Sequence, residues 1–351
     1  MSTQFLNAAS QPGFFRRLAK SSAFYFALLL ITVLVSFTTG RYGVSVEQLF
    51  TLLWLKVARL PLNDFATVNT VIFNVRLPRI LAAAMTGSAL SLSGAIYQSI
   101  FRNPMVSPGI LGVSSGAGFG AALGILLSMN LAGVQLMAFG FGSVAVSITC
   151  LFGRALKRDS DSVIMLILVG MVVSTVFASF ISLTKYVADP TDKLPAITFW
   201  LMGSLASVNM DDVRSVALPI ALGSVPLFLV RWKLNILSFG DDEARSLGVN
   251  TGPLRLMIIV CSTVITAAAI SISGIIGWVG LIIPHICRMI TGPDHKTLVP
   301  FSMLTGAIYL MIVDDIARSS VSVEIPLGII TALIGAPFFL YLIFCKQRSC
   351  R

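Results

Sequence analysis

Long apolar runs constrain this chain more than any other feature of its sequence. Ten windows are apolar over lengths close to the roughly 20 residues that a helix needs to cross a bilayer. They cover 21–39, 77–100, 109–128, 131–152, 162–187, 213–231, 253–273, 277–291, 298–316 and 327–345. Only 11% of the residues are charged, whereas soluble domains carry about 25%. The sequence therefore predicts an all-α polytopic membrane protein with about ten transmembrane helices.

The apolar windows divide the chain into one long membrane domain and two short ends. We expect residues 1–20 to form a cytoplasmic N-terminal segment, 21–345 a single transmembrane domain and 346–351 a cytoplasmic tail. Basic residues precede the first window and no small-residue cleavage site follows it, which favours a retained helix over a signal peptide. An even number of crossings places both termini on one side of the membrane.

Basic residues are unevenly distributed between the two sides that ten helices would create. With both termini inside, sixteen of the 25 Lys and Arg residues face the cytoplasm, in agreement with the positive-inside rule. The net charge of +10 therefore indicates topology, since no basic helix suggests nucleic-acid binding. In this orientation the 233–255 loop is cytoplasmic, and segments 40–76 and 188–212 lie outside. The first could form a helix at the membrane interface, and the second a short re-entrant or surface helix.

The 233–255 loop, KLNILSFGDDEARSLGVNTGPLR, is rich in charge and lies between two apolar windows. Asp241 can accept backbone N–H bonds at a helix start, and acidic residues in a first turn interact favourably with the helix dipole. Gly248 can end that helix in a left-handed cap. A plain connector needs only a few residues, so we expect a short surface helix that binds another protein.

Two further patterns concern the packing of the membrane helices. ALSLSG at 89–94 recurs as AISISG at 269–274, and the two copies would cross the membrane in opposite directions, as in the inverted repeats of many transporters. The glycine-rich stretch 109–124 favours close helix packing over a phosphate loop, because the chain has no Gly-Lys pair. If ATP drives transport, another chain must bind it.

Few ionisable side chains are placed for catalysis or metal binding. His285 and His295 have no Cys, Glu or His at ligand spacing, and we expect structural roles for both. Asp314, Asp315 and Arg318 lie near one end of the ninth window, where they could be functional, reach water or pair with one another. We expect no catalytic residue and no metal site in this chain.

Two arginines, Arg76 and Arg79, flank Leu77 and Pro78 at the start of the second window. Proline is well tolerated in the first turn of a helix, and the spacing of three places both arginines on one helix face. Two interpretations are open: the guanidinium groups snorkel to the membrane interface, or they form salt bridges with an acidic partner outside.

Five ordered segments resemble the FecCD-type permeases, the membrane subunits of ABC importers for iron–siderophore complexes, haem and cobalamin. The matching segments are RLPRILAAAMTGSALSLSGAIYQSIFRNPMVSPGILGVSSGAGFGAA, FWLMGSL, LSFGDDEARSLGVN, GIIGWVGLIIPHICRMITGPDHK and EIPLGIITALIGAPFF. The resemblance covers nearly the whole chain after the first window. It implies the type II ABC importer architecture, with a homodimer of ten-helix subunits in the bacterial cytoplasmic (inner) membrane.

The resemblance also implies which molecules bind this chain. Two ATP-binding-cassette ATPase subunits would bind inside, and an extracytoplasmic substrate-binding protein would bind outside. The ATPase would hold ATP and Mg, so this chain would hold no cofactor. Membrane lipid would surround the chain, and we expect no nucleic acid to bind it.

Functional residues of the family match particular positions of this sequence. The family's arginines that engage glutamates of the binding protein match Arg76, Arg79 and Arg318. Its ATPase coupling helix matches Phe239, Gly240, Asp241, Asp242, Glu243, Ala244, Arg245, Ser246, Leu247 and Gly248. Its cytoplasmic gate matches Asn103, Pro104 and Met105 in one loop and Ser160, Asp161 and Ser162 in another, although Asp159 and Asp161 make the second loop more acidic than the family pattern. The helix that starts at Ser162 would line the transport path.

The cargo and even the class of transporter have alternatives. An iron–siderophore complex is the predicted cargo, with haem, cobalamin or an oxyanion such as molybdate as alternatives, because the binding protein largely sets specificity. An ion-coupled secondary transporter would need carboxylates or histidines in mid-helix, whereas the acidic residues here lie at helix ends and in loops. An intramembrane enzyme would need a catalytic pair or metal ligands within the apolar windows.

Overall fold

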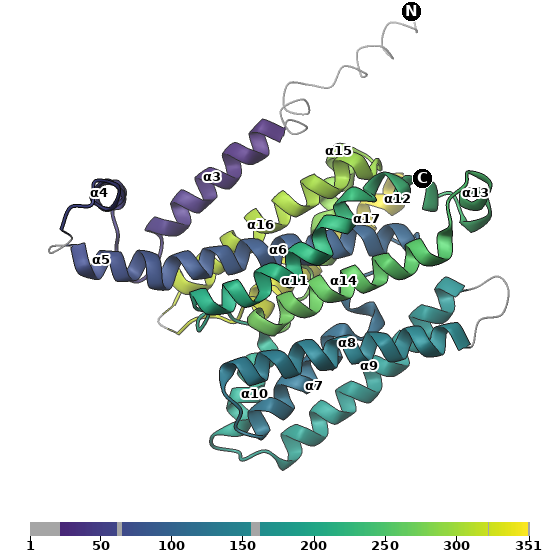
Figure 1. Ribbon diagram of the computed structural model, residues 1–351, viewed down its shortest axis with the longest axis horizontal. Coiled ribbons are helices and arrows are strands. Elements are labelled where there is room, and N and C mark those ends of the chain that lie inside the picture. Colours follow the sequence, from purple (N-terminus) through teal and green to yellow (C-terminus); the bar gives the residue numbers. More distant parts are fainter. Residues whose placement is uncertain (1–21, 62–64, 156–161, 322, 350–351) are drawn as a thin grey trace, which may run out of the picture.

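The computed structural model describes residues 22–61, 65–155, 162–321 and 323–349, and this part of the chain is helical with no β-strand (Figure 1). Six of its helical segments are long and apolar enough to cross a membrane: Ala66–Ile100, Leu131–Ala155, Ile164–Val187, Met210–Leu229, Thr251–Ser273 and His295–Ser319. Four shorter apolar helices coincide with the other predicted windows: Ala23–Thr38, Val113–Leu126, Val279–Thr291 and Leu327–Tyr341. The all-α membrane fold is confirmed, while the count of ten crossing helices stays a prediction.

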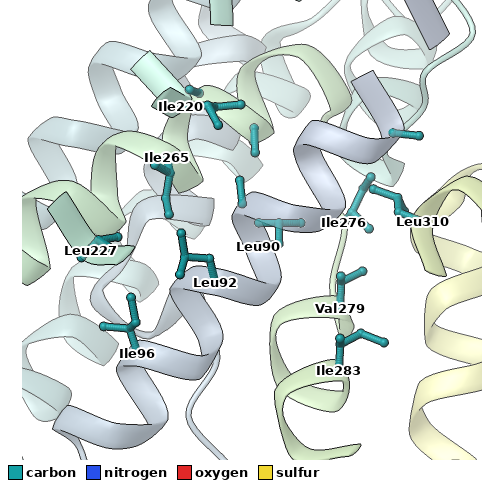
Figure 2. Close-up of a cluster of buried hydrophobic side chains, with 14 of the residues drawn as sticks. Leu90, Leu92, Ile96, Ile220, Leu227, Ile265, Ile276, Val279, Ile283 and Leu310 are labelled. Carbon is teal, nitrogen blue, oxygen red and sulfur yellow. The ribbon is translucent and has the colours of Figure 1, made fainter. Parts of the chain in front are cut away.

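Helix α6 (Leu77–Ile100) forms the centre of the larger helix bundle, and every side chain from Ala89 to Ile100 is buried. Figure 2 shows Leu90, Leu92 and Ile96 among apolar side chains of the surrounding helices. These neighbours are α11 (Met210–Leu229), α14 (Thr251–Ser273), α15 (Val279–Thr291) and α16 (His295–Ser319). Because lipid tails are as apolar as these side chains, close packing rather than exclusion of water holds such helices together.

Glycines allow the backbones around α6 to approach closely. A Cβ atom at Gly94 would lie 1.7 Å from the carbonyl oxygen of Gly280 on α15, and one at Gly87 would lie 2.1 Å from that of Gly306 on α16. Real side chains do not tolerate such distances, so only glycine permits these two helix crossings.

A smaller group of helices follows α6 in the sequence and lies beside the larger bundle (Figure 1). The predicted packing role of the glycine-rich stretch is confirmed, since Cβ atoms at Gly116 and Gly120 would lie 2.4 and 2.2 Å from carbonyl oxygens of the next helix. The group comprises a 3₁₀ turn (Pro108–Leu111), α7 (Val113–Leu126), α8 (Leu131–Ala155), α9 (Ser162–Val187) and α10 (Lys193–Met202).

Short surface helices occupy the segments where the sequence predicted them. Helix α4 (Val46–Val57) lies in the 40–76 segment, and α10 lies in the 188–212 segment. A short helix, α5 (Ala66–Thr70), continues through the π-helical segment Val71–Arg76 into α6, so this helix begins earlier than the predicted window. The first and last helices are α3 (Ser22–Thr38) and α17 (Leu327–Ser349).

Candidate functional site

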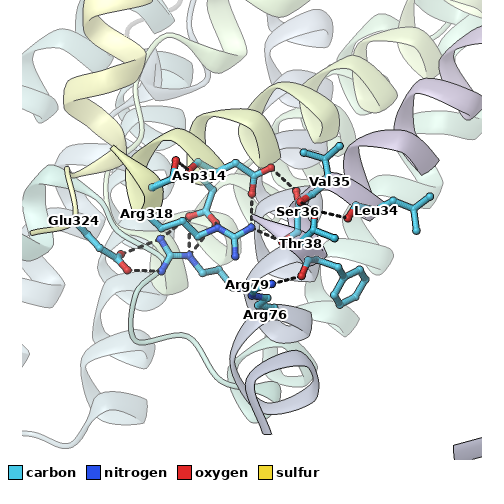
Figure 3. Close-up of polar contacts among 12 residues, drawn as sticks. Leu34, Val35, Ser36, Thr38, Arg76, Arg79, Asp314, Arg318 and Glu324 are labelled. Carbon is cyan, nitrogen blue, oxygen red and sulfur yellow. Dashed lines mark hydrogen bonds and ion pairs between the residues drawn. The ribbon is translucent and has the colours of Figure 1, made fainter. Parts of the chain in front are cut away.

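Three arginines and three carboxylates form an ionic cluster at one end of the bundle (Figure 3). We define it by Arg76, Arg79, Arg318, Asp314, Asp315 and Glu324, and call this end of the molecule the arginine end. It joins the start of α6 to the last turns of α16, and α3 lies against it. The three positive and three negative charges balance, which permits burial of a group this size.

Arg79 forms the most extensive contacts of the cluster. Its Nε lies 2.8 Å from both carboxylate oxygens of Asp314, and its Nη2 lies 2.8 Å from Asp314 Oδ1. The same guanidinium binds Glu324 through Nη1 and Nη2, each at 2.9 Å from a carboxylate oxygen. Arg79 is 5% exposed and Asp314 is 2% exposed, so this pair is shielded from water, whereas the Glu324 side chain is 24% exposed.

The other two arginines bind α3 and the segment after it. Arg318 donates to the Asp315 carboxylate and, at 2.6 Å, to the carbonyl oxygen of Ser36. The Ser36 hydroxyl in turn donates to Asp315 at 2.6 Å. Arg76 donates to the carbonyl oxygens of Phe37 and Tyr42. These contacts fix the end of α3 onto α6 and α16.

The structure brings together the three arginines that the sequence singled out, but it buries their side chains. Arg76 and Arg318 are 3% and 6% exposed, and the guanidinium groups of all three bind acceptors within the chain. The possible pairing of Arg318 with Asp314 and Asp315 is confirmed. The binding of an acidic partner stays a prediction, and such a partner would have to replace an acceptor that each guanidinium already has within the chain.

The predicted coupling helix forms at the other end of α6. Helix α13 (Asp241–Ser246) follows α12 (Arg231–Leu237), and Gly248 adopts the predicted left-handed conformation with φ of 79°. Arg79 and Arg102 lie near opposite ends of α6, about 35 Å apart at the rise of an α-helix. We call the end that carries α13 the coupling end (Figure 1).

The prediction that Asp241 caps α13 is wrong, because its carboxylate binds another helix instead. Gly240 precedes the helix, and no side chain accepts its first N–H groups. Asp241 binds Arg255 on α14 through two hydrogen bonds of 2.7 and 3.1 Å. Burial opposes ionisation of Asp241, but these bonds and the positive charges of Arg255, Arg102 and Arg245 lower its pKa below the ordinary value. Arg255 thereby fixes the start of α13 to α14.

One face of α13 is buried and the rest is open. Ala244 is completely buried, whereas Phe239 and Leu247, at the two ends of the helix, are 71% and 64% exposed. The side chains of Asp242 and Arg245 are 96% and 61% exposed. Isolated exposed apolar residues are common, but here two large ones flank a charged turn, as is typical of a protein-binding surface.

A polar contact also fixes the preceding helix at the coupling end. The amide of Asn235 on α12 donates to Asp294 at 2.7 Å, and its oxygen accepts from the backbone N–H of His295 at 2.9 Å. The Lys296 N–H and the Asn235 amide lower the pKa of Asp294. His295 is buried against Asn235, and the described residues contain no cluster of three or more His, Cys, Asp or Glu side chains that could hold a metal ion.

The predicted gate loop after α6 lies next to α13. Arg102, with a left-handed φ of 47°, begins the loop, and its Nη2 lies 3.6 Å from where a Cβ atom of Gly240 would be. Asn103 accepts a hydrogen bond of 2.9 Å from the N–H of Met105, which is 54% exposed. Of the second gate loop, Ser162 is the first residue of α9, while Asp159, Ser160 and Asp161 lie outside the described residues.

Several residues that complete these contacts carry no signal of their role in the sequence. Glu324 begins the segment EIPLGIITALIGAPFF and Arg255 ends the charged loop, so both stood within motifs that had been noted. Asn235 also lies in that loop, but its partner Asp294 is 59 residues away. Nothing in the sequence distinguished Ser36, whose partner Asp315 lies 279 residues away along the chain.

Comparison with known protein families agrees with this geometry. The model of the FecCD transport family matches residues 28–345 of the 351. The chain belongs to the FecCD transport family. The family resemblance predicted from the sequence is therefore confirmed, and the chain is a multi-pass ABC importer permease of that family.

Several relatives match over nearly their whole length. The chain is 45% identical over 324 residues to the molybdate import system permease protein MolB of Haemophilus influenzae, which covers 92% of this chain and 94% of that protein. It is 38% identical over 323 residues to the probable iron chelatin transport system permease protein of Helicobacter pylori, covering 90% and 95%.

A solved structure has the same fold. It is that of a metal-chelate type ABC transporter in an inward-facing conformation, with a TM-score of 0.82 and 43% identity, covering 91% of this chain and 97% of that one. A likeness of this extent supports the arrangement of helices described above.

Proposed function

We propose that this chain is the permease subunit of a type II ABC importer and that it works as a homodimer with two ATPase subunits and an extracytoplasmic binding protein. In this proposal the four shorter apolar helices cross the membrane together with the six long ones, which makes ten crossings. Both termini then lie in the cytoplasm, and residues 89–94 and 269–274 belong to the two halves of an inverted repeat. The observation that carries it is α13, a short charged helix with exposed apolar flanks between two membrane helices.

The surface of α13 fits the role of an ATPase docking site. Phe239 and Leu247 offer apolar anchors, and Asp242 and Arg245 offer charged contacts around them. The helix is held to α14 by Asp241 and Arg255 and lies beside Arg102 at the start of the predicted gate loop. ATP binding would move α13 with the ATPase subunits, and the attached helices would shift between outward and inward access.

The arginine end would then face the binding protein. Arg79 is bound on one side by the buried Asp314 and on the other by the partly exposed Glu324. A glutamate of the binding protein could replace Glu324 on the Arg79 guanidinium without uncovering Asp314. Docking would thus exchange one salt bridge for another, which favours specificity and orientation more than affinity.

Two cargoes have support within this architecture. An iron chelate agrees with the sequence-based prediction and with the H. pylori relative. Molybdate is the second candidate, because MolB of H. influenzae is a molybdate permease and is 45% identical to this chain. Haem and cobalamin are the other outcomes of the test below.

Radiolabelled uptake in cells that lack this gene tests both architecture and cargo. The panel is a ferric siderophore series, molybdate, haem and cobalamin, each with and without vanadate to inhibit the ATPase. We expect loss of one vanadate-sensitive uptake that plasmid-borne protein restores. Uptake that depends on this chain but ignores vanadate would instead indicate an ion-coupled transporter and refute the ABC proposal.

A pull-down experiment tests the docking role of α13. Replacing Phe239 and Leu247 with serine is expected to abolish co-purification of the ATPase while the permease keeps its thermal stability, because both side chains are exposed. The matched control is Val57→Ser, an 80% exposed apolar residue at the end of α4. Normal ATPase binding by the double variant would show that α13 is not the docking helix.

A further inference from the structure

A groove between α8 and α14 is separate from the ionic cluster, the gate loop and α13. It has a volume of about 320 Å³ and is lined by residues of the second half of α8, from Ser143 to Arg154, and by Leu256 to Val264 of α14. A second cavity of about 150 Å³ adjoins it at the Arg154 end and shares Cys150, Arg154, Leu256 and Ile259 with it.

We propose that this groove is a binding site for an anionic phospholipid, with an acyl chain along α8 and α14 and the phosphate at Arg154. The proposal needs only that these two helices cross a membrane, which their length and composition support. It does not depend on the cargo or on the ATPase partner.

The length of the groove agrees with one leaflet of a bilayer. Ser143 and Arg154 are eleven residues apart on α8, which corresponds to about 16 Å along an α-helix. The hydrocarbon core of a bilayer is about 30 Å thick, so one leaflet contributes about 15 Å. The groove is therefore about as long as one leaflet is thick, which is the length that an acyl chain spans.

The hydroxyl side chains of the groove are already hydrogen-bonded within their own helices. The Ser143 and Ser147 hydroxyls donate to the carbonyl oxygens of Phe139 and Ser143 at 2.9 and 2.8 Å, and the Thr263 hydroxyl donates to that of Ile259 at 2.7 Å. These three side chains consequently present methylene and methyl groups to the groove. An occupant need not supply hydrogen bonds there, and a hydrocarbon chain meets that condition.

The charge at the end of the groove selects the headgroup. Arg154 is exposed, and among the described residues no carboxylate forms an ion pair with it. Arg255 lines the adjoining cavity and is held by Asp241. Because Asp241 already balances the charge of Arg255, Arg154 supplies the net positive charge at this end of the groove. Charge complementarity favours an anionic lipid over a zwitterionic one.

Native mass spectrometry of the purified permease tests the site directly. The protein is titrated with phosphatidylglycerol and with phosphatidylcholine of the same acyl chains, and bound lipid is counted. We expect preferential retention of phosphatidylglycerol, and Arg154→Gln should weaken that retention roughly five-fold, the effect of about one basic residue at a membrane surface. The control is Arg214→Gln, an exposed arginine in the first turns of α11 that binds Asp211.

A second variant tests the groove independently of charge. Ser147 is exposed on α8, and Ser147→Phe would fill the groove and reduce retention of both lipids. Its control is Ser182→Phe, which replaces an exposed serine on α9 whose hydroxyl also donates to a carbonyl one turn earlier.

Two outcomes would overturn the proposal. The first is equal retention of the two lipids by the native chain. The second is unchanged phosphatidylglycerol retention in both Arg154→Gln and Ser147→Phe. If Arg154→Gln kept its lipid but lost the co-purifying ATPase, Arg154 would belong to a protein interface, and the lipid site would be refuted while the proposed function stood.

Discussion

Removing the guanidinium of Arg79 is expected to destabilise the protein strongly, because it leaves the Asp314 carboxylate buried without its main partner. Asp314 is 2% exposed, and the nearest remaining cation is Arg318, whose Nε lies 3.8 Å away. Breaking a buried ion pair by removing one partner costs about 3–5 kcal/mol. The melting midpoint of a chain this long falls by about 2 °C for each kcal/mol of lost unfolding free energy, so Arg79→Met should lower the midpoint by about 6–10 °C.

The double variant Arg79→Met with Asp314→Leu separates loss of the pair from loss of packing. It removes one positive and one negative charge, so Arg318 and Asp315 still balance each other. Glu324 also loses Arg79, but its side chain is partly exposed and can bind water. Replacing a buried ion pair with apolar residues of similar volume is often neutral or stabilising. We therefore expect the double variant to melt within about 3 °C of the native protein.

The assay is a thermal melt of the purified permease in one detergent, with all variants compared at one scan rate. Arg214→Gln is the control, since its salt bridge with Asp211 joins side chains that are 74% and 88% exposed, and exposed pairs contribute about 1 kcal/mol or less. If Arg79→Met melted like the native protein, or if the double variant lost as much as the two single changes together, the cluster would not stabilise the fold through this pair.

Three further predictions follow from other contacts. Gly94→Ala is expected to prevent accumulation of folded protein, because its Cβ would lie 1.7 Å from a backbone oxygen; a normal yield and melt would contradict this packing. Glu324→Gln should lower the Kd of the binding protein for the detergent-solubilised permease several-fold in a titration, because Glu324 no longer competes for Arg79. Weaker binding would show that Glu324 itself contacts the partner. The lowered pKa of Asp241 means that its bond to Arg255 stabilises the protein above the ordinary carboxylate pKa and is lost as pH falls through the lowered value. Protection of α13 amides from hydrogen exchange should accordingly be constant from pH 7 to 5, after correction for intrinsic rates. Asp241→Asn, which lacks the charge at every pH, should show weaker protection of the same amides at pH 7.

Local sequence patterns predicted most of the helices in the described part of the chain. The window at 77–100 coincides with α6, and the windows at 131–152 and 253–273 match α8 and α14 within three residues. Membrane helices are predictable in this way because each must satisfy its own backbone hydrogen bonds in a medium without water. A local pattern also predicted the left-handed conformation of Gly248, because glycine commonly ends a helix in this way.

The roles of charged residues were harder to predict. The sequence identified Arg76, Arg79 and Arg318 as notable but left open whether they face water, lipid or a partner. The structure places Arg79 against Asp314, which is 235 residues away, and Asp241 against Arg255 instead of the N-terminus of its own helix. A carboxylate near a helix start has several possible partners, and the fold decides which of them lies within reach.

The sequence by itself determined that this chain is a bundle of membrane helices of the FecCD family with a charged helix between two of them, because apolar length and ordered motifs are properties of the chain. Only the tertiary structure decided that the notable arginines are buried and paired, that Arg102 lies beside the start of α13, and that α8 and α14 leave a groove between them. These features depend on distances between residues far apart in sequence, which are fixed when the helices pack and not before.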